Sequence, residues 1–190
     1  TAGAVSFQNQ AQFHPLQFLS QIAESLNIYE ETKALAFKGT TVVTESGSID
    51  AKKIIVTTHF PILNKHGAYF LKMYQSRSYM MAVRGTAKPE GMYLSADADA
   101  LSFRTWEDML RVGCEGHRTG KKSDAWLTAE SCVKKHFPEG EICCRWAAQD
   151  CMTLDGMPYI GRYSPGTPWL YVATGFNKWG MTASMVSAMV

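Results

Sequence analysis

The sequence has few of the features that mark secreted, membrane or nucleic-acid-binding proteins. Its five cysteines are an odd number and include no CxxC pair, which favours a reduced, cytoplasmic protein over a disulfide-bonded one. The formal net charge of +2 does not indicate a nucleic-acid or membrane surface. No apolar run has the length of a transmembrane helix, and no charged segment leads into an apolar signal sequence. We therefore expect a cytoplasmic protein without a nucleic-acid partner or a transmembrane segment.

The composition is that of a folded, globular protein. Hydrophobic residues make up 46% of the 190 residues and aromatic residues 12%, which excludes a disordered chain. This length allows one large domain or two small ones. The sequence begins without Met, and it stops at Met189-Val190 inside an apolar segment of helical character. We therefore expect the chain to be part of a longer protein.

The first sixty residues predict an α/β arrangement. Pro15 suits the first turn of a helix, and apolar residues recur after it at helical spacing. Strands are expected over 27–37 and 41–46, joined by a turn, and a short buried strand over 51–58.

The middle of the chain has a different pattern, with four short strands separated by turn residues. A helix is expected to follow, with Ser123 or Asp124 as its N-cap and Pro138 beyond its end, and then a further strand over 141–150. The Gly- and Pro-containing stretch 153–162 is expected to be a loop. The four strands, which predict an antiparallel sheet inserted into the outer α/β part, are 76–84, 91–97, 101–106 and 109–116.

The last segment combines a strand, a glycine-containing turn and a helix. A buried strand over 170–173 leads into Thr174–Gly180, and a helix follows over 181–190. Glycines in this position bring bare backbone N–H groups to a ligand, and the helix N-terminus adds unpaired donors and a partial positive charge. Such a site suits a phosphate, a carboxylate or a carbonyl oxygen that gains negative charge on reduction. On this pattern alone, an ordinary strand-to-helix turn with glycines for steric reasons is an equal alternative.

The end of the sequence resembles a known family of flavoenzymes. "LDGMPYIG" at 154–161, followed after eight residues by "LYVATGFNKWGMT" at 170–182, is similar to the C-terminal part of FAD-dependent oxidoreductases of the D-amino-acid oxidase, glycine oxidase and sarcosine oxidase family. "FHPLQFL", "IVTTHFP", "RWAAQD" and "GFNKWGMT" are most similar to the branch that carries a C-terminal Rieske iron–sulfur domain. The resemblance covers nearly the whole chain and is strongest over 146–185.

The resemblance implies a fold and a domain organisation. The fold class expected from it is α/β with an α+β insert, because the family's FAD-binding domain is discontinuous and contains an inserted antiparallel substrate domain. Residues 1–70 then form a partial FAD-binding domain, residues 71–150 the substrate domain, and residues 151–190 the return to the FAD-binding domain.

The resemblance also implies an activity and a set of cofactor-binding residues. The activity is oxidation of a C–N bond of an amine or amino acid by hydride transfer to FAD, with an electron acceptor downstream. A non-catalytic binding or assembly module is the main alternative, and a nicotinamide-linked Rossmann enzyme a weaker one. The cofactor-binding candidates carried over are Val43, His59, Gly161, Thr174, Gly175, Phe176, Asn177, Lys178, Trp179, Gly180, Met181 and Thr182.

Two motifs expected for this branch are missing from the sequence. No G-x-G-x-x-G occurs near residue 1, so the pyrophosphate-binding turn is expected outside this chain. Of the two halves of a Rieske motif, only a C-x-x-H is present, from Cys114 to His117, and we interpret it as a chance match. A 2Fe-2S cluster is therefore expected in another domain, and no metal site is expected here.

The substrate side departs from the family at one position. Glycine and D-amino-acid oxidases place an arginine shortly before the D-G-x-P element to bind the substrate carboxylate. Here Gln149 and Asp150 occupy that stretch, and Asp150 can either hold a cationic amine or cap a turn. Nearby Arg145 either faces away from Asp150 or pairs with it. The substrate-binding candidates are Arg104, Trp146 and Asp150, and no catalytic residue is assigned, because a neutral amine needs no dedicated base.

Overall fold

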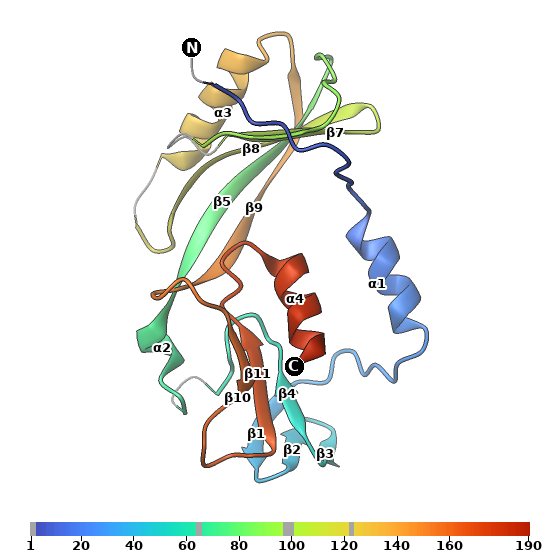
Figure 1. Cartoon of the computed structure of the whole chain (residues 1–190), viewed down its shortest axis with the longest axis vertical. Helices are drawn as coiled ribbons and strands as arrows, with labels where there is room; N and C mark the ends of the chain where they lie inside the picture. Colours follow the sequence, from blue (N-terminus) through green and yellow to red (C-terminus); the bar gives the residue numbers. More distant parts are fainter. Residues whose placement is uncertain (1–2, 64–65, 97–100, 122–123) are drawn as a thin grey trace. The chain divides into compact units, whose positions relative to one another are not determined.

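The computed structural model describes residues 3–63, 66–96, 101–121 and 124–190. The fold is a mixed α/β arrangement of two compact units, Thr1–Ala51 and Lys52–Val190 (Figure 1).

The first unit contains one helix and a three-stranded antiparallel sheet. Helix α1 (Pro15–Ala23) begins with the expected proline, and the His14 ring accepts a hydrogen bond from the Gln17 N–H at 3.3 Å. Strands β1 (Ala34–Lys38), β2 (Thr41–Thr44) and β3 (Gly47–Asp50) pair in sequence order. The prediction of a strand from residue 27 was wrong over 27–33, because Glu31 has a left-handed backbone (φ 49°) that interrupts an extended chain.

The second unit contains a small mixed sheet. Strand β11 (Leu170–Thr174) lies between β10 (Tyr159–Arg162), with which it pairs antiparallel, and β4 (Ile54–Val56), with which it pairs parallel. Helix α4 (Gly180–Met189) follows β11. The prediction of a loop over 153–162 was wrong for 159–162. The ladder of hydrogen bonds to β11 outweighs the local effect of Pro158 and Gly161.

The second unit also contains the predicted antiparallel sheet, which is confirmed. Its order is β6 (Met92–Leu94), β7 (Ser102–Trp106), β8 (Met109–Arg118), β5 (Met73–Arg84) and β9 (Glu141–Thr153). The short helix α2 (Tyr69–Lys72) precedes β5, and helix α3 (Ala125–His136) lies between β8 and β9 in the sequence. Asp124 is the N-cap of α3, although its side chain makes no capping hydrogen bond, and Ser123 is outside the described residues.

The core of the second unit lies between α3 and one face of this sheet. Tyr79, Met81 and Val83 alternate along β5 and pack with Ala129 and Val133 of α3. Ser78 and Met80, which alternate with these residues along β5, face the other way, because side chains alternate along a strand.

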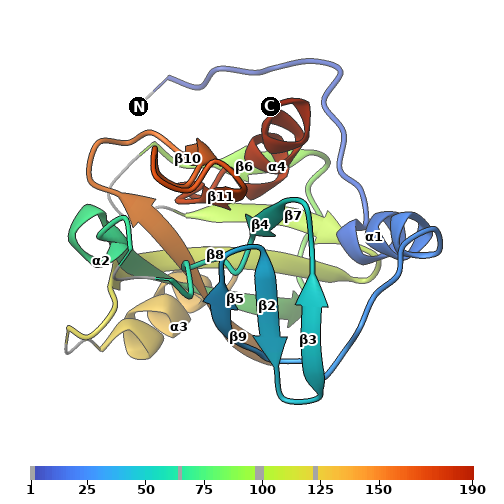
Figure 2. The same ribbon diagram turned by 90° about the horizontal axis from the view of Figure 1, so that it is seen from below.

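The opposite face, here called the Ser78 face, is defined by strand register. It comprises Ser76, Ser78 and Met80 of β5 and the residues directly opposite them on β9, which are Asp150, Ala148 and Trp146. Figure 2 shows α3 and α4 on opposite sides of β8. Since α3 covers the core face, the Ser78 face is on the same side of the sheet as α4.

The ion pair between Arg84 and Asp108 leads to a first prediction. The Arg84 Nε and Asp108 Oδ2 atoms are 3.1 Å apart, and both side chains are exposed. Asp108→Asn is therefore expected to change the free energy of unfolding by less than about 1 kcal/mol, because water and salt screen exposed pairs. Urea denaturation at low and high salt measures the change. A loss above about 2 kcal/mol would contradict this assignment.

Candidate functional site

The ends of β4 and β11 meet at one edge of the small sheet. The two strands are parallel, and the hydroxyl of Thr174, at the end of β11, donates a hydrogen bond to the carbonyl oxygen of His59, which follows β4. Thr174 is buried, and the His59 backbone is left-handed with φ 62°. Ligands of α/β sheets bind outside the carboxyl ends of the strands. This edge is therefore where a ligand is expected.

Gly175 brings the chain that leaves β11 into contact with the five-stranded antiparallel sheet, here called the large sheet. Its backbone is left-handed with φ +69°, and a Cβ atom there would lie 2.4 Å from Thr153 Cγ2 and 3.2 Å from Met73 Sδ. Both the backbone angle and the close approach exclude a side chain at this position.

The side chain of Asn177 forms hydrogen bonds that link the turn between β11 and α4 to the end of β9. Its Oδ1 accepts the Thr153 N–H at 2.8 Å, and its Nδ2 donates to Thr153 Oγ1 at 2.9 Å and to the Gly156 carbonyl oxygen at 3.2 Å. Its own N–H donates to the Cys151 carbonyl oxygen at 3.2 Å. Asn177 and Lys178 both have left-handed backbones, at φ 49° and 71°. These bonds hold two successive strained residues in one conformation.

The D-G-x-P element contributes a turn of its own beside Asn177. Asp155 Oδ1 accepts the Met157 N–H at 3.1 Å, and Oδ2 accepts the Tyr159 hydroxyl at 3.3 Å. The backbone bond from Met157 holds the pKa of the Asp155 carboxyl below its usual value. The motif therefore positions Gly156, whose carbonyl oxygen Asn177 uses.

The N-terminus of α4 is uncapped and open. Trp179 is the N-cap, its side chain makes no capping bond, and 71% of its surface is exposed. The Ala183 N–H donates to the Trp179 carbonyl oxygen at 2.8 Å. The three N–H groups before it, of residues 180–182, have no partner within the described part of the chain. A Cβ atom added at Gly180 would meet nothing within 4 Å. The helix start thus offers free donors and a partial positive charge.

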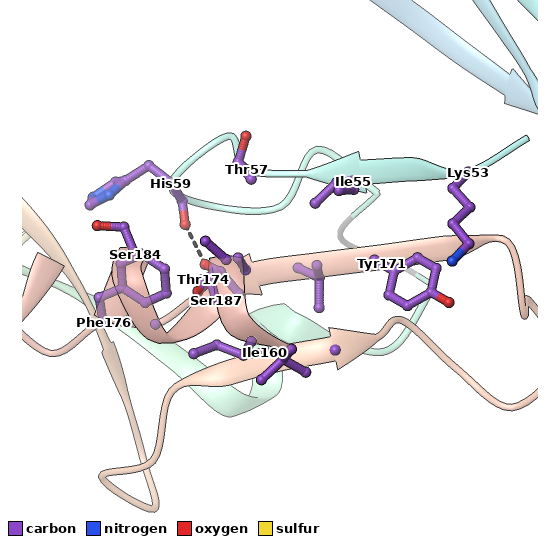
Figure 3. A pocket seen from close by; sticks show the side chains of 16 residues that line it. Lys53, Ile55, Thr57, His59, Ile160, Tyr171, Thr174, Phe176, Ser184 and Ser187 are labelled. Carbon is purple, nitrogen blue, oxygen red and sulfur yellow. Dashed lines mark hydrogen bonds between the residues drawn. The ribbon is translucent and has the colours of Figure 1, made fainter. Parts of the chain in front are cut away.

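A cavity of about 630 Å³ lies beside this edge, between the small sheet and α4 (Figure 3). Figure 3 shows His59, Thr174 and Phe176 at the end of the cavity where the strands finish. Among the cofactor-binding candidates, those that line it are His59, Gly161, Thr174, Gly175 and Phe176.

The remaining cofactor-binding candidates lie elsewhere. Asn177, Lys178, Trp179, Gly180, Met181 and Thr182 form the adjacent turn and helix start and do not line the cavity. Val43 lies on β2, in the unit that ends at Ala51. Sequence reasoning did not identify Lys53, Ile55, Thr57, Ser184 and Ser187, which also line the cavity. It also missed Thr153, although a threonine two residues before the D-G-x-P element was a usable signal.

Strand register places the three substrate-binding candidates on one face of the large sheet. Trp146 and Asp150 are on the Ser78 face of β9. Arg104 of β7 is opposite Arg111 of β8, which is opposite Ala82 of β5, so Arg104 is on the same face. With two strands between β7 and β9, however, Arg104 is at least roughly 14 Å from Trp146 and Asp150.

Arg145 faces the other way from Asp150. It forms an ion pair with Glu130 of α3, and its guanidinium lies 5.3 Å from the centre of the Trp126 ring. The alternative in which Arg145 pairs with Asp150 is therefore wrong.

The C-x-x-H sequence of β8 has a structural role. Cys114 is buried opposite Tyr79. One ring nitrogen of His117, Nδ1, lies 2.9 Å from the Arg118 carbonyl oxygen, and the other, Nε2, lies 2.8 Å from the Tyr79 hydroxyl. Since a carbonyl only accepts, Nδ1 donates the bond to Arg118.

The structure gives no cluster of metal-binding side chains and no spanning helix within the ranges it describes. No group of three or more His, Cys, Asp or Glu side chains is close enough there to hold a metal ion. No described helix is long and apolar enough to cross a membrane.

Comparison with known proteins establishes the family. The sequence model described as FAD dependent oxidoreductase matches residues 1–190, so the chain belongs to this family. It is 38% identical over 202 residues to "Putative Rieske 2Fe-2S iron-sulfur protein YhfW" from Bacillus subtilis (strain 168). That match covers 97% of this chain and 40% of YhfW. The recognition of the family and its Rieske-bearing branch is confirmed.

Solved structures confirm the fold. Glycine oxidase from Geobacillus kaustophilus superposes with a TM-score of 0.70 at 17% identity, covering 85% of this chain and 47% of that one. L-Proline dehydrogenase from P. horikoshii gives a TM-score of 0.69 at 19% identity, covering 85% and 48%. The chain thus spans about half the length of these structures.

Asn177 gives a second prediction. Asn177→Ala is expected to destabilise the protein by about 2 kcal/mol, because it removes the bonds to Thr153 and Gly156 and leaves alanine in a left-handed backbone. Asn177→Gly loses the same bonds without the backbone strain, so its loss should be smaller. Urea unfolding of both variants measures the difference. Equal stability of the wild type and the alanine variant would show that the turn does not depend on this side chain.

Proposed function

We propose that the full-length protein is an FAD-dependent oxidoreductase that oxidises a C–N bond of an amine or amino acid. The observation that carries the proposal is the uncapped N-terminus of α4, which follows a glycine turn at the edge of the small sheet. Membership of the FAD dependent oxidoreductase family supports it. So do the names of the structural relatives, among them glycine oxidase, L-proline dehydrogenase and L-amino acid deaminase.

The residues at this site fit a flavin ring. The open space at Gly180 admits a flat group close to the backbone, and the unpartnered N–H groups of residues 180–182 point donors at it. When bound, FAD supplies the redox chemistry by accepting the hydride. The chain's part is to bind the cofactor, to stabilise negative charge near the helix start, and to position the substrate against the Ser78 face.

The proposed domain organisation follows the same division as the sequence prediction. Strands β4 and β11 are neighbours in one sheet although β5–β10 separate them in the sequence. This supports a substrate domain over 71–150 inserted between two parts of an FAD-binding domain, 1–70 and 151–190.

The electron acceptor is proposed from the sequence relative. YhfW is named as a Rieske 2Fe-2S protein, and this chain spans 40% of it. We infer that the full-length protein carries a 2Fe-2S domain outside these residues, which passes electrons singly to a cytoplasmic acceptor.

The visible absorption spectrum of the full-length protein, before and after dithionite, tests the proposal. Flavin bands that bleach, and bleach again on anaerobic addition of an amino acid or amine, are the expected result. A broad iron–sulfur absorption in addition would support the Rieske domain. A colourless protein that takes up no added FAD would refute the proposal and favour a binding module.

A further inference from the structure

Lys178 places a cation over the Ser78 face. Lys178 lies in the turn before α4 with a left-handed backbone (φ 71°), and its Nζ donates to Ser78 Oγ at 3.0 Å. The same Nζ lies 4.0 Å from the point where a Cβ atom would stand at Gly116 of β8. The ammonium group therefore lies where β5 and β8 meet, between the proposed flavin site and the sheet proposed to bind substrate.

This ammonium group forms no ion pair within the part of the chain that the structure describes. In the described ranges the ion pairs are Arg84 with Asp108 and Arg145 with Glu130, and Lys178 takes part in neither. An ammonium group has three N–H donors, and Ser78 uses one of them. Lys178 is exposed, so an anion can reach the remaining donors.

A negative charge lies near it on the same face. Asp150 is opposite Ser76, and Lys178 bonds to Ser78, two residues further along β5. Asp150 and Ser78 are diagonal neighbours on two paired strands, roughly 7–8 Å apart. An α-amino acid bridges such a distance when its ammonium and carboxylate groups each make a charge-assisted hydrogen bond of about 2.8 Å.

The residues before the D-G-x-P element supply no cation for a substrate carboxylate. Gln149 accepts a hydrogen bond from Thr119 at 3.0 Å, and Asp150 is an acid. An acid at 150 repels a carboxylate. A carboxylate therefore needs another cation, and Lys178 supplies one.

We propose that Lys178 binds the carboxylate and Asp150 the ammonium group of a zwitterionic α-amino acid. This inference rests on the proposed function and narrows its substrate class to amino acids. It also assigns Lys178 to the substrate, whereas the sequence resemblance assigned it to the cofactor.

Paired substrates test the inference in the full-length protein with FAD bound. Lys178→Met is expected to raise KM at least tenfold for an amino acid such as proline and to leave the oxidation of pyrrolidine, which lacks the carboxylate, unchanged. Lys178→Arg should retain most of the affinity for proline. Asp150→Asn should raise KM for both substrates. Lys134→Met on α3 is the matched control and should change neither.

An equal rise in KM for proline and pyrrolidine in Lys178→Met would overturn the inference, and so would a lower FAD content. Either outcome would indicate a structural or cofactor-binding role for Lys178. Binding of a carboxylate that the enzyme does not oxidise can be measured without turnover. Benzoate should perturb the flavin spectrum and raise the melting temperature of the wild type, with a Kd at least tenfold weaker in Lys178→Met. If neither amino acid nor amine is oxidised, the proposed function fails. The benzoate titration then still decides whether Lys178 binds a carboxylate.

Discussion

Gly175→Val is expected to destabilise the protein by about 3 kcal/mol or more. The backbone at Gly175 has φ +69°, and the added Cβ would stand 2.4 Å from Thr153 Cγ2, at the end of β9. A left-handed backbone costs an ordinary residue about 1–2 kcal/mol, and forcing extra carbon atoms into a packed site about 1–3 kcal/mol. A β-branched side chain suffers most in this conformation.

Urea unfolding of Gly175→Val, with Gly166→Val as control, measures this effect. Gly166 is exposed, its φ is outside the left-handed region, and a Cβ there meets nothing within 4 Å. The control should therefore stay within about 0.5 kcal/mol of the wild type. Similar stabilities for the two variants would show that β11 does not approach β9 in this way.

The elements that could be predicted from the sequence are those whose local pattern and tertiary environment agree. Buried and more exposed residues alternate along strands of the large sheet, and the core residues Tyr79, Met81 and Val83 occupy every second position of β5. Strand β10 was missed because its stability comes from pairing with β11, and nothing within 159–162 records that partner. The error at 27–33 arose because a single left-handed residue, Glu31, is invisible in a hydrophobic pattern.

The candidate site could be predicted from the sequence less completely than the fold. The glycine turn could be located from its motif, since Gly175 and Gly180 are local features of the sequence. The contacts that shape it join distant residues, because Thr174 bonds to His59 and Lys178 to Ser78, 100 positions away. These contacts depend on the parallel pairing of β4 with β11 and on the inserted sheet. Such pairings leave no periodic signal in one sequence.

Gly180→Val is expected to lower the FAD affinity of the full-length protein at least tenfold, or about 1.4 kcal/mol in binding free energy. A Cβ at Gly180 meets nothing within 4 Å in the chain itself, so the side chain fits the protein and occupies only the space beside the helix start. Any group that binds there must then move away from the N–H groups of residues 180–182. The loss of affinity follows from the loss of these hydrogen bonds and of the favourable charge at the helix N-terminus.

The ratio of flavin to protein absorbance, followed by titration of the apoprotein with FAD, measures this change, and circular dichroism confirms the fold. Gly180→Ala is the graded control and should have an intermediate affinity. Full FAD occupancy in Gly180→Val, with the fold intact, would remove the helix start from the cofactor site. Together with Gly175→Val, the comparison separates two uses of glycine in one turn. At 175 the missing side chain makes room for the protein's own Thr153, and at 180 it leaves the space proposed for the cofactor.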